Sequence, residues 1–415
     1  MNRLLAGIFN KMLSDGLLVV YDHKNARHEF GAGQGNGAAP QKTATIRFHT
    51  AKSQWAIVRD PILGAAESYM DGSLTLENAD GSEGEIIDML DLFTWNLKWH
   101  PDNAVRMALA NKPRLFTALE QLNARRAAKR NVAHHYDLSG KLYDLFLDKD
   151  RQYSCAYFRD NVDDLERAQQ DKKAHIAAKL LLKSEQRGLD IGCGWGGMAL
   201  YLNEISGIDM TGVTLSEEQL GIARQRAQDR GVSDQVRFSL TDYRDVDDRF
   251  DRIVSVGMFE HVGRPNFAEF FNKSCQLLKD DGVMLLHTIG RADGPGVTDS
   301  FTRKYIFPGG YTPALSEVMP HIEKAGLYVT DIEILRLHYS KTLKYWYDRC
   351  KAARQDITTL YDERFYRMWQ FYLAASRCAF DYGGHVNFQI QLARQVDTVP
   401  LTRDYMGHAE REMLG

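Results

Sequence analysis

The stretch Leu189-Asp-Ile-Gly-Cys-Gly-Trp-Gly-Gly197 decides the fold of this chain. An apolar strand runs into it, and four glycines then lead into a helix that starts near Met198. Glycines suit such a turn because a Cβ would keep a nucleotide off the backbone and because these turns often need positive φ. Gly192, Gly194 and Gly197 also satisfy the dinucleotide pattern G-x-G-x-x-G. The stretch predicts a nucleotide-type ligand on a strand–turn–helix unit, and it leaves nicotinamide and S-adenosylmethionine as alternatives.

From about residue 180, apolar runs alternate with amphipathic helices. Strands are expected over residues 188–192, 210–214, 236–240, 252–256, 283–287, 328–337 and 386–396, with helices such as 217–230 and 268–278 between them. Such alternation predicts a parallel doubly wound α/β sheet that binds ligands at the carboxyl ends of its strands. A polar and aromatic insertion over about 291–325 and a helical stretch over 341–380 follow the fifth strand.

Residues 1 to about 120 read instead as a small mixed domain. Apolar residues recur at helical spacing from Leu4 to Met12, while Asn10, Lys11 and Asp15 interrupt any signal-peptide core. We therefore expect an amphipathic surface helix there. Further expected elements are strands at 45–48 and 55–58, helices at 60–69, 85–99 and 113–129, and a glycine-rich loop at 31–37. The predicted domains are 1–125 and 126–415, the second with an insertion over about 291–380.

Composition narrows the classes of function. The length of 415 residues suits two domains, and a net charge of −3 gives no electrostatic case for nucleic-acid binding. The five cysteines form no C-x-x-C pair, which argues against a zinc site or a disulfide framework and for a reducing compartment. No apolar run approaches the roughly 18 residues of a membrane-spanning helix. We expect a cytoplasmic protein without a bound metal.

The residues that end the second and third strands favour one cofactor. A nicotinamide fold places an acid roughly 20 residues after the first glycine, to bind the ribose hydroxyls. That region reads Gly212-Val-Thr-Leu-Ser216, with no acid before Glu217. Asp190, just before the glycine turn, can reach a cationic ligand, and Asp242-Tyr243 ends the third strand, where adenine lies in methyltransferase-type sheets. These positions favour S-adenosylmethionine.

Further motifs carry a resemblance to a known family. They are Glu67-Ser-Tyr-Met-Asp-Gly72, Tyr153-Ser-Cys-Ala-Tyr-Phe158, Gly257-Met-Phe-Glu-His-Val-Gly263, Leu285-Leu-His-Thr-Ile-Gly290, Tyr305-Ile-Phe-Pro308 and Tyr339-Ser-Lys-Thr-Leu343. Together with the glycine turn, the chain resembles the cyclopropane-fatty-acid synthase family of S-adenosylmethionine-dependent enzymes over nearly its whole length. The resemblance implies a seven-stranded Rossmann-like class I methyltransferase sheet with a helical insertion. It also implies a small α+β N-terminal domain associated with lipid or membrane.

By this resemblance the reaction is methylene transfer to the cis double bond of an unsaturated acyl chain in membrane phospholipid. The implied cofactor contacts, besides Asp190, are Tyr153, Ser154, Gly192, Gly194, Trp195, Gly196, Thr214, Gln219, Asp242 and Tyr243. The family also holds a bicarbonate ion beside the methyl donor. Its cradle carries over to Cys155, Glu260, His287, the backbone of Ile289 and Tyr339. A homodimer is implied as well.

The chemistry needs these residue types. An alkene is a weak nucleophile, so the sulfonium methyl must be held close and dry, and ring closure then needs a base. Taken singly, Cys155 reads as a small buried residue, His287 as a satisfied core histidine and Tyr339 as a packing aromatic. The joint placement of Glu260 and His287 at adjacent strand ends favours the functional interpretation.

Alternatives of three kinds stay open at this point. The same scaffold also supports small-amine N-methylation or plain methylation of an acyl chain, and a catalytically silent lipid-binding protein belongs to a different class. The basic run Ala124-Arg-Arg-Ala-Ala-Lys-Arg130 is either a solvated helix face or a site for anionic head groups. With the amphipathic N-terminus, it predicts peripheral contact with the inner membrane face.

Overall fold

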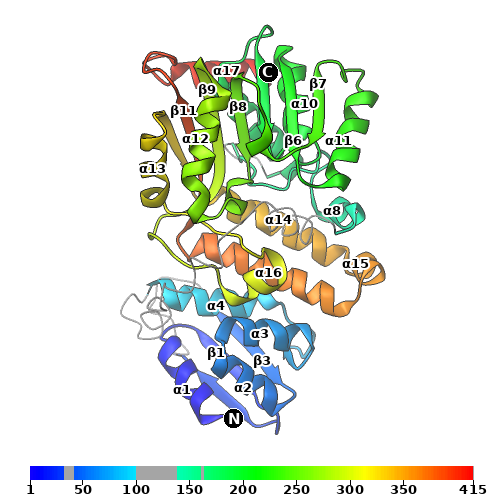
Figure 1. Cartoon of the computed structure of the whole chain (residues 1–415). Coiled ribbons are helices and arrows are strands. Elements are labelled where there is room, and N and C mark those ends of the chain that lie inside the picture. Colours follow the sequence, from blue (N-terminus) through cyan, green and yellow to red (C-terminus); the bar gives the residue numbers. More distant parts are fainter. Residues whose placement is uncertain (32–41, 100–137, 160–162, 415) are drawn as a thin grey trace. The chain divides into compact units, whose positions relative to one another are not determined.

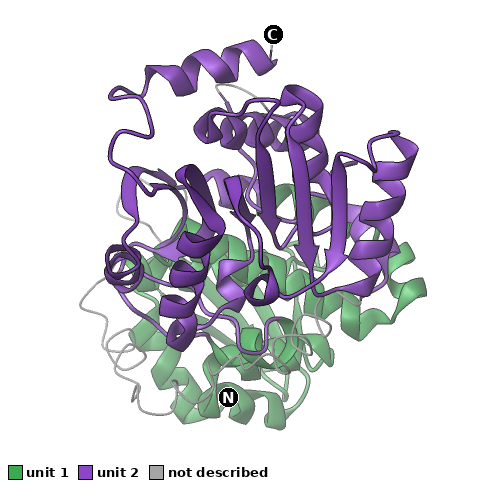
Figure 2. Ribbon diagram, turned by 45° about the horizontal axis from the view of Figure 1, so that its top comes forward, with its two compact units in different colours: residues 1–114, 299–306, 343–384 green, residues 115–298, 307–342, 385–415 purple. Residues whose placement is uncertain are grey.

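The computed structural model describes residues 1–31, 42–99, 138–159 and 163–414. The chain forms two compact units, which Figure 2 colours separately. Unit 1 comprises Met1–Arg114, Asp299–Ile306 and Leu343–Gly384; unit 2 comprises Leu115–Thr298, Phe307–Thr342 and His385–Gly415. Each unit is therefore assembled from segments that lie far apart in the sequence.

Unit 2 is built on a seven-stranded sheet with the order β10-β11-β9-β8-β5-β6-β7 (Figure 1). The strands are β5 (Arg187–Ile191), β6 (Asp209–Thr214), β7 (Val236–Leu240), β8 (Phe250–Val256), β9 (Leu278–Arg291), β10 (Tyr328–Leu335) and β11 (His385–Ala393). Strand β11 runs antiparallel to both neighbours, and the pairs from β9 to β7 are parallel. This order confirms the predicted α/β class I methyltransferase sheet.

Helices cover both faces of this sheet. Two buried clusters mark the faces: Leu285 belongs to one cluster, and its neighbours Met284 and Leu286 belong to the other, as side chains alternate along a strand. Helices α9 (Leu165–Leu180), α10 (Gly197–Ser206) and α11 (Glu217–Asp229) pack on the first face; α12 (Phe267–Leu277) and α13 (Leu315–Lys324) pack on the second. Within the described ranges, unit 2 also holds helix α8 (Gly140–Phe146) and helix α17 (Asp404–Leu414), which packs against α9.

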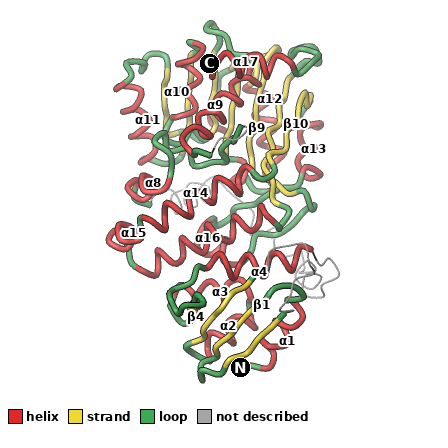
Figure 3. The backbone as a smooth tube through the Cα atoms, turned by 180° about the vertical axis from the view of Figure 1, so that it is seen from behind, coloured by secondary structure: helices red, strands yellow, loops and turns green. Residues whose placement is uncertain are grey.

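Unit 1 holds a smaller mixed sheet with the order β2-β1-β3-β4 (Figure 3). Its strands are β1 (Leu17–Tyr21), β2 (Arg27–Phe30), β3 (Thr43–Phe48) and β4 (Leu74–Leu76). Its early helices are α1 (Arg3–Met12), α2 (Ala51–Arg59), α3 (Pro61–Met70) and α4 (Ile86–Trp99). From later in the chain come α15 (Arg354–Leu360) and α16 (Glu363–Asp381), which packs on α3 and α4. Helix α14 (His338–Ala352) begins in unit 2 and ends in unit 1.

The described elements match most of the predicted ones. The N-terminal amphipathic helix is confirmed as α1, with Asn2 as its N-cap. The strand predicted over 55–58 is wrong, because these residues lie in α2, where the Thr50 hydroxyl accepts from the Ser53 N–H as an N-cap. A short apolar run fits a strand or a buried helix face equally well. The helical stretch over 341–380 is divided into α14, α15 and α16.

Some predictions fall outside the described residues. These are the helix over 113–129, the basic run over 124–130, and all of the glycine-rich loop except Gly31. The boundary between residues 125 and 126 also falls there, so the division into domains 1–125 and 126–415 stays a prediction.

Candidate functional site

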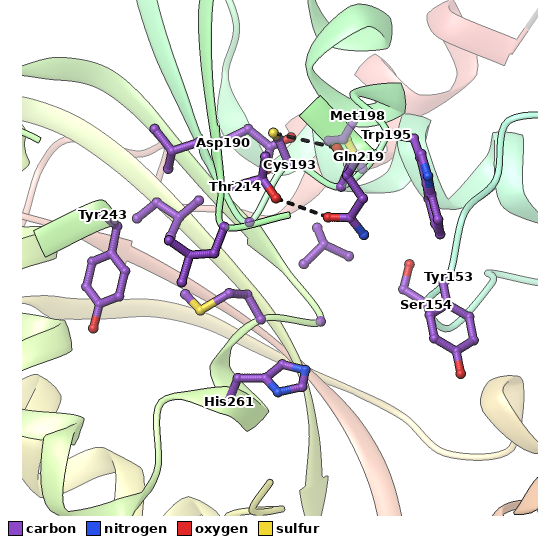
Figure 4. A pocket seen from close by; sticks show the side chains of 18 of the residues that line it. Tyr153, Ser154, Asp190, Cys193, Trp195, Met198, Thr214, Gln219, Tyr243 and His261 are labelled. Atoms are coloured by element: carbon purple, nitrogen blue, oxygen red, sulfur yellow. Dashed lines mark hydrogen bonds between the residues drawn. The ribbon is translucent and has the colours of Figure 1, made fainter. Parts of the chain in front are cut away.

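A pocket opens at the carboxyl ends of β5, β6 and β8 in unit 2 (Figure 4). It is lined by every cofactor contact predicted from the sequence except Gly196: Tyr153, Ser154, Asp190, Gly192, Gly194, Trp195, Thr214, Gln219, Asp242 and Tyr243. In the close view, Tyr153, Ser154 and Trp195 lie on one side of the pocket and Tyr243 on the other. The structure therefore gathers residues from five separate chain segments around one space.

The glycine turn has the conformation that its sequence predicts. Gly192, Gly194 and Gly196 have φ values of 83°, 53° and 82°, which side-chain-bearing residues rarely adopt. No atom lies within 4 Å of the position of a Cβ on Gly194, so that glycine faces open space. A Cβ on Gly196 would lie 2.7 Å from Cζ of Phe238, so this glycine allows close packing of the turn and does not line the pocket.

Hydrogen bonds fix the polar walls. The Thr214 hydroxyl donates to the Gln219 side-chain oxygen at 3.0 Å, the contact drawn in Figure 4. Nε1 of Trp195 donates to Glu218 at 3.1 Å, which orients the indole ring at the rim. Asp242 accepts from the Arg244 guanidinium at 2.9 and 2.6 Å. These walls are preorganised by contacts within the protein.

Asp190 has different surroundings. Its carboxyl group is buried, with 2% of the residue exposed, and Oδ2 forms no hydrogen bond within the described residues. Burial raises the pKa of Asp190 to about 7, although the positive charge of Lys172 and the N–H of Ala199 act in the opposite direction. A buried carboxylate with an unsatisfied oxygen is suited to a cationic ligand.

Glu260 and Ile289, two of the predicted bicarbonate contacts, are in direct contact. Glu260 lies in a short 3₁₀ turn (Phe259–His261) after β8, and its Oε1 accepts from the Ile289 backbone N–H at 2.6 Å. Its Oε2 is buried and forms no hydrogen bond in the described part of the chain. Burial raises the pKa of this carboxyl group, and the Ile289 hydrogen bond opposes that rise.

His287 is fully buried, and both of its ring nitrogens contact amide side chains of β11. The Gln389 amide lies 3.1 Å from Nδ1, and the Asn387 amide lies 2.9 Å from Nε2. Because Lys179 donates to the Gln389 oxygen at 2.6 Å, the Gln389 NH₂ faces Nδ1. The ring proton then sits on Nε2. The Asn387 atom at 2.9 Å from Nε2 is the amide nitrogen, so this amide must turn over for its oxygen to accept that proton. His287 is a neutral imidazole held on both sides.

Cys155 and Tyr339 come from adjoining segments. Cys155 is fully buried, its thiol contacts the Ala156 carbonyl oxygen at 3.4 Å, and burial raises the pKa of that thiol. The Ala156 N–H donates to the Thr342 hydroxyl at 3.1 Å, in the first turns of α14, which also carry the buried Tyr339. The chain next to Cys155 thus lies along the start of the Tyr339 helix.

Gly257 connects these groups to the pocket. Its N–H donates to the His287 carbonyl at 2.9 Å, and a Cβ on it would lie 3.8 Å from Cβ of Ser154. The ends of β8 and β9 and the Ser154 segment therefore meet beside the pocket. The unsatisfied Glu260 Oε2 fits an ion that offers an O–H group. The Ile289 N–H and both His287 nitrogens already have protein partners.

Two motifs of the sequence resemblance also meet in unit 1. Glu67 accepts from Lys304 at 2.6 Å and from the Tyr305 hydroxyl at 2.8 Å. Asp71 accepts from Arg364 of α16 at 2.7 Å. The Glu67–Gly72 stretch is thus tied to segments more than 200 residues away.

Several other residues at the pocket were not predicted from the sequence. These include Arg151, Gln152, Met198, Met258 and His261, which line the pocket, and Lys172 behind it. Met258 and His261 flank predicted Glu260, so proximity along the chain was an available signal. Lys172 had no such signal, because one lysine in a helix is ordinarily a solvated residue.

Comparisons with known proteins identify the family of this chain. A family profile described as mycolic acid cyclopropane synthetase matches residues 123–390. The cyclopropane-fatty-acyl-phospholipid synthase of Escherichia coli K12 is 38% identical over 362 residues, covering 87% of this chain and 90% of the relative. A probable fatty acid methyltransferase of Pseudomonas putida is 36% identical over 357 residues, covering 84% and 86%.

Among solved structures, mycolic acid cyclopropane synthase CmaA1 in complex with SAH and CTAB superposes with a TM-score of 0.61 at 34% identity. The match covers 64% of this chain and 97% of that one. No helix within the described ranges is both long and apolar enough to cross a membrane. The chain belongs to the mycolic acid cyclopropane synthetase family, which groups it with cyclopropane synthases and fatty acid methyltransferases.

Proposed function

We propose that this protein is a cyclopropane-fatty-acyl-phospholipid synthase. It transfers a methylene group from S-adenosylmethionine to the cis double bond of an unsaturated acyl chain in membrane phospholipid. The observation that carries the proposal is the placement of the buried, unsatisfied oxygens of Asp190 and Glu260 at neighbouring strand ends, β5 and β8. The 38% identity to the Escherichia coli synthase over 87% of this chain supports the same substrate class.

Asp190, Thr214 and Gln219 are assigned to the methyl donor. The Asp190 carboxylate meets the positive charge of the donor, since an opposite charge favours its ionised form. The preformed Thr214–Gln219 hydrogen bond needs no reorganisation on binding. Positioning of this kind supplies several kcal/mol of a barrier, roughly 7–11 in the best intramolecular cases. Holding the sulfonium methyl in place is the main task, because the alkene is a poor nucleophile.

Glu260 is assigned to the second half of the reaction. Bicarbonate, when bound, supplies a base for the proton lost on ring closure and a negative charge that stabilises the cation. Glu260 Oε2 accepts a hydrogen bond from the ion and fixes its orientation, while Oε1 stays bound to Ile289. Cys155 and Tyr339 are assigned to the same ion, and His287 to holding the end of β9 in register through its two amide contacts.

Peripheral membrane contact is assigned to one surface of unit 1. Helices α1 and α2 contain no acidic residue, and their four exposed cations, Arg3, Lys11, Lys52 and Arg59, form no ion pair among the described residues. Leu4 on α1 is 58% exposed and Trp55 on α2 is 56% exposed. We call these six residues the α1–α2 surface. Basic groups beside an exposed tryptophan and leucine suit an anionic lipid surface.

A second candidate is methyl transfer to the acyl chain without ring closure. The Pseudomonas putida relative, named a probable fatty acid methyltransferase, favours it. Both reactions use the same donor pocket and acyl substrate. They differ in which proton the cation loses: loss from the transferred methyl group closes the ring, and loss from a neighbouring carbon gives a branched, unsaturated chain.

The test incubates the protein with S-adenosylmethionine and vesicles of unsaturated phospholipid. A mass gain of one methylene in the acyl chains is expected, with cyclopropane protons in the nuclear magnetic resonance spectrum. A methyl-branched or methylene-branched product would replace the proposal with the second candidate. Unchanged lipid in the presence of bound donor would leave the catalytically silent lipid-binding alternative. Light scattering on the protein without vesicles tests the homodimer that the sequence resemblance implies.

A further inference from the structure

Lys172 of α9 lies fully buried behind the donor pocket. Its Nζ donates to Gln152 Oε1 at 2.6 Å and to Ser154 Oγ at 2.8 Å, and both acceptors belong to residues that line the pocket. A buried ammonium group is costly unless it is paired and hydrogen-bonded, so such a lysine needs a specific reason.

Helix α9 also holds the backbone of the same segment. The Gln169 side chain, one turn before Lys172, donates to the carbonyl oxygens of Gln152 and Ser154 at 3.1 and 3.0 Å. Gln169 therefore fixes the main chain of residues 152–154, and Lys172 fixes the two side chains that face the pocket. The residue after Ser154 is Cys155. Gln169 and Lys172 therefore also fix the chain where the proposed ion site begins.

Lys172 also interacts electrostatically with Asp190. Its charge lowers the pKa of that otherwise isolated carboxyl group, while burial lowers the pKa of Lys172 itself to about 8. The titratable groups that act electrostatically with Lys172 are Asp148, Asp150, Cys155, Lys173, Asp190 and His287. Asp150 is already paired with Lys173 and Arg226, and burial raises the pKa of Asp148. Among these carboxyl groups, Asp190 is the one that lines the pocket.

We propose that Lys172 is a positioning residue for the methyl donor: its ammonium group orients Gln152 and Ser154 on the pocket wall and supplies the positive charge that favours ionised Asp190. The assignment deepens the proposed function, because it rests on this pocket being the donor site. Lys172 does not touch the reacting atoms.

The test measures binding of S-adenosylmethionine by calorimetry, without lipid, at pH 7 and pH 9. Lys172→Met is expected to weaken binding at least tenfold at pH 7. The loss should shrink at pH 9, where Asp190 is ionised in both proteins and wild-type Lys172 is itself largely neutral. Lys172→Arg, which keeps the charge, should bind the donor within about threefold of the wild-type protein at pH 7.

Lys179→Met is the matched control. Lys179 is a second buried lysine of α9, with 1% of the residue exposed, and it is bound to Glu333 and Gln389 instead of the pocket segment. Its loss is expected to lower thermal stability but to leave donor affinity within twofold.

Three results would overturn the assignment: unchanged affinity in Lys172→Met, a loss that is equal at both pH values, or an equal loss in Lys179→Met. If Lys172→Met does not fold, Lys172→Arg decides, and a loss of donor affinity of tenfold or more at pH 7 in that variant counts against the assignment. Failure of the wild-type protein to bind the donor would instead refute the proposed function.

Discussion

Glu260 accepts a hydrogen bond from the backbone of Ile289 at 2.6 Å, which ties the loop after β8 to the end of β9. One carboxylate oxygen is thereby fixed, and the other stays buried without a partner among the described residues. A side chain held in this way presents one acceptor in a defined direction. The sequence resemblance predicts that both residues belong to one site, and their contact is consistent with that prediction.

Glu260→Gln should lower turnover by about 10²-fold or more, since general acid–base groups contribute roughly 10²–10⁴-fold. The amide keeps an oxygen for the Ile289 N–H but loses the negative charge. Because Glu260 is assigned to the bicarbonate ion and not to the methyl donor, donor affinity should stay within twofold. Product mass and calorimetry measure the two quantities. Glu317→Gln is the control, because Glu317 is also buried, accepting from Tyr311 at 2.8 Å, and lies outside the pocket. Near-normal turnover in Glu260→Gln would refute the role of Glu260.

Donor affinity should rise as the pH increases from 6 to 8. Burial raises the pKa of Asp190 to about 7, so the carboxyl group is largely neutral at pH 6 and ionised at pH 8. The cationic donor binds the ionised form better, and binding releases a proton. His261, also in the pocket, does not titrate in this range because burial lowers its pKa to about 4. Asp190→Asn should bind weakly at every pH; a persisting pH dependence in that variant would contradict the assignment.

The Asp190 carboxyl group also affects the free energy of unfolding. Rising pH changes this quantity in the opposite direction to donor affinity. The pKa of Asp190 in the folded protein is raised, so the folded state binds more protons than the unfolded state between pH 4 and 7. The contribution of Asp190 to the free energy of unfolding is therefore present at low pH and is lost as the pH rises towards 7. Denaturant unfolding of the wild-type protein and Asp190→Asn at pH 5 and 8 measures the difference. A larger Asp190 contribution at pH 8 would contradict the sign.

His287 should remain neutral, with its proton on Nε2, at pH values at which an ordinary histidine is protonated. Burial lowers the pKa of this imidazole well below its usual value, and Gln389 donates to Nδ1. Nitrogen-15 spectra of the imidazole groups, assigned with His287→Gln, would identify the tautomer. In Gln389→Leu the fixed tautomer should be lost. A doubly protonated ring at pH 6 would contradict the arrangement.

Replacing Arg3, Lys11, Lys52 and Arg59 together by Gln should weaken binding to anionic vesicles by at least tenfold. Each basic group near such a surface contributes about 1 kcal/mol, and the α1–α2 surface has four. Binding to neutral vesicles should change little, which serves as the control. The companion variant replaces Arg125, Arg126, Lys129 and Arg130. If only the companion variant loses binding, the membrane contact belongs to the basic run and not to the α1–α2 surface.

The sequence predicted the residues of the donor pocket better than the contacts around the proposed bicarbonate site, and the reasons are physical. The glycine turn and the strand ends are local features, and ten of the eleven predicted cofactor contacts line one pocket. Gly196 is the exception, since its close approach to Phe238 depends on tertiary packing. The amide contacts of His287 depend on the register of β11 against β9, which pairs His287 with Gln389 and Ile289 with Asn387. No local pattern encodes that pairing.

Strand β11 is the last strand in the chain, yet it lies between β9 and β10. During synthesis the other six strands leave the ribosome before it does, and β10 has no partner in the sheet until β11 arrives. Asn387 and Gln389 complete the surroundings of His287 only at that moment. A nascent chain can thus form most of its donor pocket while β9 still lacks β11 as its neighbouring strand. Enzymatic competence should be acquired in one step, when β11 joins the sheet.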